Sequence, residues 1–216
     1  MKRFLIAALC SAAAVCVLPA CAPKTDYTKY ISEKRSEIYL YSDDETDIKI
    51  NCVSREQPYC TDGICGNMCE LREIFITLAT TPESVEISVD GFTGEMNYEA
   101  VEKRFSLTYT APPFNADGVE IGLEYNGIQK NYRALNVKDS GVITCEQAVK
   151  CAAEYDEELF ESLKTKRDFA GEIYVRLLFD DGCYYYVGVC DRDKNITAYL
   201  LDGGTGKIIT SKKISA

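Results

Sequence analysis

Cysteine offers the most chemistry of any residue type in this sequence, because histidine is absent. The 216-residue chain has 11 Cys, no His and no Trp. Without an imidazole the chain cannot build a Ser-His-Asp triad, a Cys-His dyad or an HExxH zinc site. A phosphate-binding loop is also missing, since Leu201 stands where the first glycine of that motif belongs and Ile208 replaces its Ser/Thr. We therefore expect a protein that is not an enzyme and that binds no cofactor.

Four of the cysteines are close together in the sequence. Cys52, Cys60, Cys65 and Cys69 have the spacing C-x7-C-x4-C-x3-C. Four neighbouring thiolates are able to bind zinc or an iron–sulfur cluster. The spacing differs from the x4/x2 of plant-type clusters, however, and it contains no C-x2-C pair. Structural disulfides are therefore the favoured interpretation, and a metal or redox site is the alternative.

The other cysteines beyond the first 21 residues are Cys145, Cys151, Cys183 and Cys190. Disulfide pairing within each of two domains would give four cysteines to each. Disulfides persist outside the cytosol, and each contributes about 2–4 kcal/mol to a small domain with a limited core. All eight are candidate disulfide cysteines, with the pairing left open.

The N-terminal 21 residues have the organisation of an export signal. Two basic residues at positions 2 and 3 precede about 15 uncharged residues, which is too short a run to span a bilayer as a helix. The run ends in Leu18-Pro19-Ala20-Cys21, which resembles the lipobox of bacterial lipoproteins. The resemblance implies a signal peptide over residues 1–20 and acylation of Cys21, which anchors the protein outside the cytoplasm on the bacterial cell membrane. The alternative is a secretory signal cleaved near residue 20 or 22, without an anchor.

The charge balance limits the partners that the protein can bind. The chain has 24 Lys+Arg and 34 Asp+Glu, a formal net charge of −10. Loss of residues 1–20 removes two positive charges and no acids, so the mature charge is −12. An acidic surface repels phosphate backbones and anionic lipid head groups. We expect no nucleic-acid partner, and membrane contact through the lipid anchor alone.

The segment after the anchor differs from the rest of the chain. Residues 21–36 are polar, mixed in charge and without a hydrophobic period. Such a composition predicts a tether that separates a folded part from the membrane.

Residues 37–140 alternate apolar and polar residues in short bursts, for example at Ile48, Ile50 and Cys52. This alternation is typical of strands with one buried and one solvated face. Turn signals separate the bursts, and the strongest is Asn126-Gly127, whose residues tolerate positive φ. About seven strands at this spacing predict an antiparallel β-sandwich domain with immunoglobulin-like architecture.

Residues 141–216 predict a helix followed by a small antiparallel sheet, which makes the chain mainly β with an α+β C-terminal domain. Thr144 and Gln147 fit a capping box, and an amphipathic helix of about six turns follows, with a candidate break near Asp156. Apolar runs separated by turn signals predict four short strands. Their ranges are Ile173–Phe179, Cys183–Cys190, Ile196–Asp202 and Lys207–Thr210.

The loop between the first two of these strands sets where one cysteine points. A three-residue loop at positions 180–182 places Phe179 opposite Cys183 and gives the more uniformly apolar face. Cys183 then points at the helix, where Cys145 or Cys151 can meet it. A two-residue loop would reverse every side chain.

Two segments of the C-terminal domain are similar to a known family. The helix start, from Ile143 through Ala148 to Ala152, resembles the opening of a PepSY domain, and Tyr185-Tyr-Val-Gly-Val189 with Asp202-Gly-Gly-Thr-Gly206 resembles its end. The resemblance covers residues 142–213. It implies a module of the kind found in propeptides of secreted metallopeptidases and in envelope proteins thought to restrain peptidases.

Together these patterns predict a non-enzymatic, membrane-anchored extracytoplasmic lipoprotein. The resemblance implies a protein-binding or peptidase-regulating module whose partner is an envelope or secreted protein. One alternative is a structural or adhesive envelope protein in which the β-sandwich binds the partner. A metal or redox protein that uses the 52–69 cysteines is the other.

Overall fold

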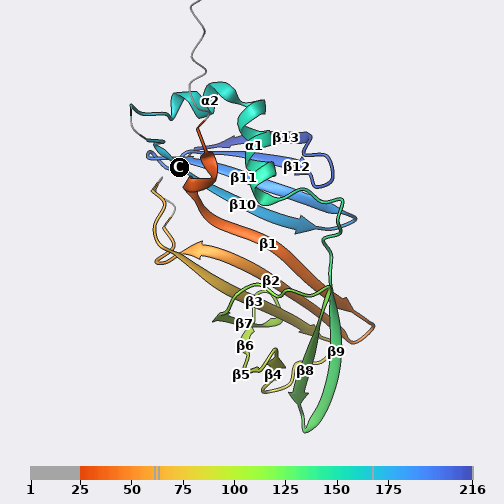
Figure 1. The fold of residues 1–216 in the computed structure, drawn as a ribbon. Coiled ribbons are helices and arrows are strands. Elements are labelled where there is room, and N and C mark those ends of the chain that lie inside the picture. Colours follow the sequence, from red (N-terminus) through yellow and green to blue (C-terminus); the bar gives the residue numbers. More distant parts are fainter. Residues whose placement is uncertain (1–24, 61, 63, 167, 216) are drawn as a thin grey trace, which may run out of the picture.

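A computed structural model describes residues 25–60, 62, 64–166 and 168–215. The predicted signal peptide and Cys21 lie outside these described residues. Figure 1 shows two lobes that share one strand, a β-barrel and a four-stranded meander with helices on one face. Within the described ranges, no helix is long and apolar enough to cross a membrane.

The larger lobe is a nearly closed antiparallel barrel of nine strands. Its strands are β1 (Ile31–Ser42), β2 (Thr46–Glu56), β3 (Met68–Leu78), β4 (Glu86–Val89), β5 (Phe92–Glu95), β6 (Asn97–Glu99), β7 (Arg104–Thr110), β8 (Gly118–Tyr125) and β9 (Ile128–Asn136). β1, β2, β3, β7 and β6 are neighbours in that order. β9 closes the ring from the other side, because it pairs with β8 and with β1 at Tyr39↔Asn136 and Leu40↔Leu135.

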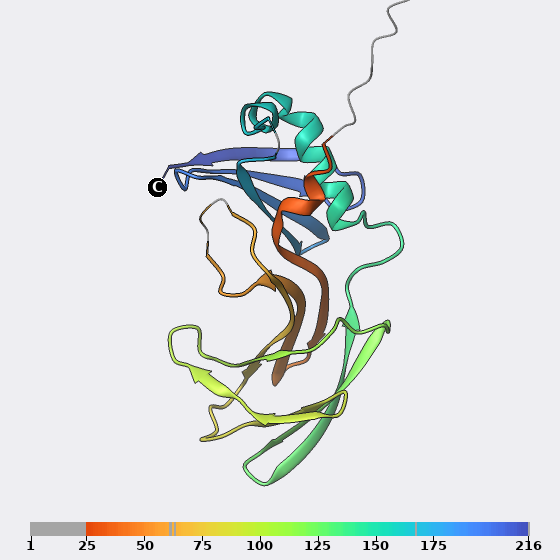
Figure 2. The same ribbon diagram turned by 60° about the vertical axis from the view of Figure 1, so that its left-hand side comes forward.

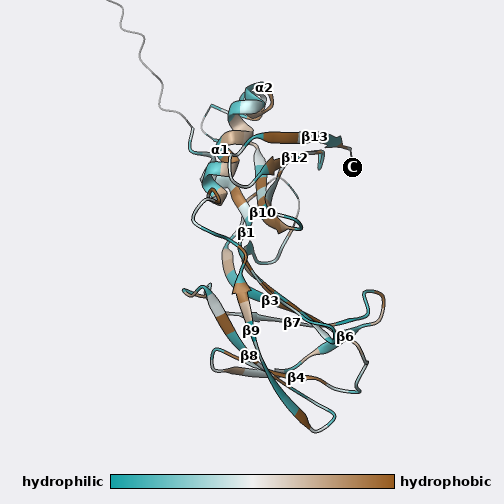
Figure 3. Cartoon of the chain, turned by 90° about the vertical axis from the view of Figure 1, so that its right-hand side faces the viewer, coloured by the Kyte–Doolittle hydropathy of each residue, from teal (hydrophilic) through white to brown (hydrophobic). Residues whose placement is uncertain are grey.

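The predicted β-sandwich with immunoglobulin-like architecture is therefore wrong. A sandwich has two sheets that face each other, whereas here one sheet curls until its inner face encloses the core. Ile48, Ile50, Ile74 and Ile76 lie on that inner face and are at most 1% exposed. In Figure 3 hydrophobic and hydrophilic segments alternate along the barrel strands, as the sequence does. Alternation fixes which side chains are buried, but a barrel and a sandwich require the same alternation.

The smaller lobe is an antiparallel meander with two short α-helices on one face. It consists of η1 (Tyr27–Tyr30), α1 (Cys145–Tyr155), α2 (Glu157–Ser162), β10 (Gly171–Phe179), β11 (Cys183–Asp191), β12 (Ile196–Asp202) and β13 (Ile208–Ile214). The predicted turn is confirmed, since Phe179 pairs with Cys183. Val175 and Val187 are consequently buried against α1.

The helical segment is two helices, and they meet at Asp156, where the sequence offered a candidate break. The predicted capping box at the start of α1 is confirmed, with the Thr144 hydroxyl accepting from the Gln147 N–H at 3.2 Å. Asp156 ends α1 and begins α2, because its carboxylate accepts the Leu159 N–H at 3.1 Å. The same carboxylate accepts the Tyr199 hydroxyl at 2.7 Å, which fixes the break over β12. An aspartate at this position competes with the helix for backbone donors.

Strand β1 joins the two lobes and begins inside the segment predicted as a tether. Its first half pairs in parallel with β10, from Ile31↔Ile173 to Arg35↔Arg176, and its second half belongs to the barrel. Before it, Tyr27 packs edge-on against Phe160 at a ring distance of 4.8 Å. Residues 26–36 are thus part of the folded body. Bulges near Glu33 and after Arg35 break the alternation that would have marked a strand.

Candidate functional site

All eight candidate disulfide cysteines lie within the described residues, and their thiols are free in this structure. They occupy four places: the barrel strands, the loop between β2 and β3, the α1 side of the meander, and the opposite side of the meander. Pairing within each of the two domains therefore stays a prediction.

Cys52 and Cys69 point to opposite sides of the barrel wall. Cys52 is 1% exposed among the core isoleucines, and burial raises the pKa of its thiol to about 11. It lies opposite Arg72 on β3, three residues from Cys69. Because side chains alternate along a strand, an odd separation puts Cys69 on the outer face. The four thiols of residues 52–69 do not converge, and the described residues contain no group of three or more His, Cys, Asp or Glu placed to hold a metal ion.

Three cysteines lie on the α1 side of the meander. Cys145 is 2% exposed, its thiol donates to the Arg35 carbonyl at 3.5 Å, and burial raises its pKa to about 12. The Cys183 thiol donates to the Val137 carbonyl at 3.4 Å. Cys151 lies against the turn that follows β12. The prediction that Cys183 faces the helix is consistent with the Phe179 pairing, because Cys183 shares a side with Val187.

Cys190 lies on the other face of the meander, away from α1. It is directly opposite Glu172 on β10, and both side chains are fully buried. The loop between β2 and β3 reaches this face, as Figure 2 shows, and its Asp62 N–H donates to Glu172 at 3.0 Å. The Cys65 thiol, from the same loop, donates to the Ile31 carbonyl at 3.2 Å. Cys190 thus lies on the face that this loop approaches, apart from Cys145, Cys151 and Cys183 on the α1 side.

A buried polar network links the lobes where β1 meets β10. Glu33 is 3% exposed and accepts from Nε and Nη2 of Arg176 at 2.6 and 2.9 Å. Beside it, the Ser32 hydroxyl donates to Glu172 at 2.7 Å. The sequence did not predict the roles of Ser32 and Glu33, because polar side chains without a hydrophobic period indicate a solvated segment. The one signal in the sequence was the run of charged residues from Glu33 to Arg35, directly before the first predicted strand.

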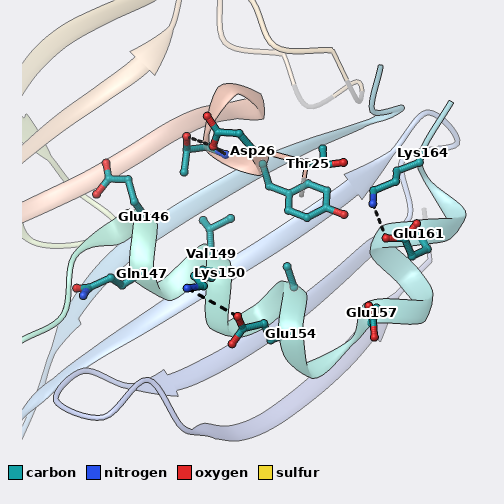
Figure 4. A pocket seen from close by; sticks show the side chains of 13 residues that line it. Thr25, Asp26, Glu146, Gln147, Val149, Lys150, Glu154, Glu157, Glu161 and Lys164 are labelled. Carbon is teal, nitrogen blue, oxygen red and sulfur yellow. Dashed lines mark hydrogen bonds and ion pairs between the residues drawn. The ribbon is translucent and has the colours of Figure 1, made fainter. Parts of the chain in front are cut away.

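A groove of about 550 Å³ lies between η1 and the two helices (Figure 4). Five acidic residues and two lysines line it. Both lysines are already paired, Lys150 with Glu154 at 3.9 Å and Lys164 with Glu161. The groove therefore carries an excess of negative charge and disfavours acidic or phosphate groups.

The free edge of the meander is the surface best suited to backbone recognition. β13 is the last strand of the sheet and pairs only with β12 among the described strands. Six of its seven residues are exposed, including Ile209 at 52% and Ile214 at 43%. An edge strand offers unpaired N–H and C=O groups to an extended segment of another chain, and exposed side chains add selectivity.

Comparisons of the chain with known protein families, with curated protein sequences and with solved structures give no match. The lipobox and PepSY resemblances therefore stay predictions.

Proposed function

We propose that this chain is a bacterial lipoprotein, anchored outside the cytoplasm through acylated Cys21, and that it is a non-enzymatic protein-binding module. The partner is an envelope or secreted protein. The observation that carries the binding proposal is the free β13 edge with its exposed isoleucines. The lipobox residues support the anchor.

The edge fits a protein partner better than a small molecule. Strand addition extends the sheet by hydrogen bonds between backbones, so it needs an extended polypeptide. Ile209 and Ile214 would bury apolar surface that water now covers, which contributes about 25 cal/mol per Å². The PepSY resemblance supports a secreted peptidase as the partner.

The anchor is tested separately from the binding surface. We expect the mature protein, expressed in a bacterium and purified with detergent, to have an intact mass that begins at residue 21 and includes the added acyl chains. Cys21→Ala removes the acylation site, so that variant should leave the detergent phase. An unmodified wild-type N-terminus would exclude the lipoprotein assignment.

The binding surface is tested with two matched point variants. Ile209→Lys places a charge on the β13 edge, and Ile128→Lys makes the same change on the barrel, where Ile128 is 51% exposed. Envelope extract passed over wild type should yield a partner that Ile128→Lys retains and Ile209→Lys loses. Point variants are required because deletion of the meander would remove β10, the neighbour of β1.

The same pair of variants evaluates the structural or adhesive alternative, in which the barrel binds. That alternative is favoured by the exposed apolar residues of the barrel, Val101 at 92% and Ile128. It predicts the reverse result, with binding lost in Ile128→Lys and retained in Ile209→Lys. Equal recovery of every protein by both variants would contradict both binding surfaces.

A further inference from the structure

Positive charge is concentrated in and beside β13, although the protein as a whole is acidic. Residues 203–216 contain Lys207, Lys212 and Lys213 and no Asp or Glu, whereas the formal net charge of the whole chain is −10. Lys212 and Lys213 lie within β13, and both are exposed. The free edge of the meander therefore carries two adjacent cations.

The strand next to β13 offers these lysines no counter-charge. Lys212 is directly opposite Ala198 on β12, and Lys213 is directly opposite Thr197. Among the residues that the structure describes, neither lysine takes part in an ion pair or a side-chain hydrogen bond. Both ammonium groups are thus available to the side chains of another molecule.

The register of β13 determines which part of the edge can accept a regular strand. From Thr210 to Ile214 the pairing of β13 with β12 has no irregularity. The register shifts before Thr210, where Ile209 is the extra residue of a bulge. A bulge interrupts the ladder of backbone hydrogen bonds. Residues 210–214 are therefore the segment that an added strand can follow.

We infer that the occupant of the β13 edge is an extended acidic segment of the protein partner, added antiparallel to residues 210–214. The inference rests on the proposed function and specifies the chemistry of the partner. Antiparallel pairing is favoured because parallel pairs are slightly less stable per residue.

The order of side chains in the partner segment follows from the register. Residues directly opposite in an antiparallel pair share a face of the sheet, and the two chains run in reverse order. The partner segment begins with an apolar residue opposite Ile214. Two acidic residues follow directly, the first opposite Lys213 and the second opposite Lys212.

The same lysines disfavour a second copy of this chain as the occupant. Two β13 strands that pair antiparallel about a two-fold axis bring four lysines into adjacent strands, and a register centred on Lys212 puts that lysine opposite its own copy. Like charges directly opposite are destabilising, and lysine on an edge strand opposes self-association. An acidic strand turns the same cations into attractive cross-strand pairs, so the edge discriminates between these two occupants.

Three peptides test the charge and the direction of the added strand. All are N-acetylated and amidated: Thr-Val-Glu-Glu-Thr-Thr-Thr, its reverse Thr-Thr-Thr-Glu-Glu-Val-Thr, and the uncharged Thr-Val-Gln-Gln-Thr-Thr-Thr. The readout is the shift of the backbone amide resonances of residues 210–214 in ¹⁵N-labelled protein at low salt. The first peptide should bind about three- to tenfold more tightly than the glutamine peptide, because two opposite-charge pairs form. It should also bind more tightly than its reverse, which has the same composition and charge.

Charge-reversal variants test the register and exclude general charge effects. Lys212→Glu should weaken binding of the first peptide by about threefold or more, since one attractive pair becomes repulsive. The peptide Thr-Val-Glu-Lys-Thr-Thr-Thr places its lysine opposite position 212, so it should bind this variant more tightly than it binds wild type. Lys103→Glu is the matched control, because it makes the same change in charge at an exposed lysine of the barrel. The control should bind the first peptide as wild type does.

Four results would overturn the inference. They are no shift with any peptide at millimolar concentration, equal affinity for the glutamate and glutamine peptides, equal or tighter binding of the reverse peptide, and equal loss in Lys212→Glu and Lys103→Glu. A concentration-dependent dimer whose β13 amides shift on association would identify a second copy as the occupant and would also overturn it.

These results are separate from the test of the proposed function. If Ile209→Lys loses the envelope partner while the peptides bind without regard to charge, the binding surface stands and the acidic partner is wrong. If Ile209→Lys retains the partner, the binding surface itself is wrong, whatever the peptides show.

Discussion

Replacing Arg176 with Met should destabilise the protein far more than replacing its partner Glu33 with Gln. The ion pair is asymmetric, because the side chain of Glu33 is 4% exposed and that of Arg176 is 33% exposed. Without Arg176, a carboxylate remains buried with weak compensation. Without the Glu33 charge, the guanidinium still reaches solvent. Met retains the apolar stem of the arginine, so packing changes little.

The size of the loss follows from the protonation of Glu33. A buried carboxylate without its partner can become neutral, and at pH 7 this costs about 1.36 kcal/mol for each pH unit above its ordinary pKa of about 4.3. Neutralisation alone thus costs at most about 3.7 kcal/mol, within the range measured for broken buried pairs. The neighbouring charge of Arg35 supplies some attraction, so we expect a loss of about 2–4 kcal/mol. Glu33→Gln should cost about 1 kcal/mol.

The pH dependence identifies the cause. Burial raises the pKa of Glu33, but the hydrogen bonds and charge of Arg176 outweigh it, so the pKa lies below its ordinary value. In wild type this stabilisation is present above pH 4.3 and is lost as the pH falls through the lower pKa of the folded state. The Arg176→Met variant lacks this stabilisation at every pH. The cost of neutralising Glu33 in the variant falls by up to about 2.7 kcal/mol from pH 7 to pH 5, so the difference between variant and wild type should narrow by up to that amount.

Urea unfolding of wild type and both variants at pH 7 and pH 5 measures these differences. A loss for Arg176→Met that is the same at both pH values would refute the role of a buried charge. So would a loss for Glu33→Gln as large as that for Arg176→Met at pH 7.

Three further predictions concern the meander and the thiols. Thr144→Ala should lower the free energy of unfolding by about 1 kcal/mol in urea, through loss of the capping box. Gly206 has φ +72, and an added Cβ would lie 2.7 Å from the Cys151 sulfur. Gly206→Ala should thus cost about 1–3 kcal/mol, and Cys151→Ala in the same chain should restore only part of it, since the backbone strain remains. In fully reduced protein at pH 8, maleimide should modify exposed Cys60 in the native state and buried Cys52 only on unfolding. A time course followed by mass spectrometry measures the two labelling reactions. Labelling of both thiols at the same time would contradict the prediction.

Local features of the meander could be predicted because nearby residues determine them. The capping box depends on two side chains three positions apart, Thr144 and Gln147. The pairing of Phe179 with Cys183 depends on a three-residue turn and on which register collects the apolar side chains. Neither depends on distant parts of the chain. The break at Asp156 is partly of this kind, although its second contact, with Tyr199, comes from a strand 43 residues later.

The barrel could not be distinguished from a sandwich, because closure depends on long-range pairing. The inward positions would alternate in the same way in either architecture. What closes the ring is the contact of β9 with β1, over a separation of nearly a hundred residues.

The folding of residues 26–36 into the body changes what the proposed anchor would do. A tether over residues 22–36 would allow the protein to stand up to about 50 Å from the membrane, at about 3.4 Å per residue. η1 and β1 instead hold the chain from residue 26, with Tyr27 packed on Phe160 and the Tyr30 hydroxyl bonded to Asp168 at 2.6 Å. Residues 22–25 alone then separate Cys21 from the body, a reach of at most about 14 Å. In an acylated protein the η1 end of the meander would lie next to the lipid head groups. Figure 1 places the far end of the barrel on the opposite side of the molecule, so an envelope partner approaching from outside would meet the barrel first.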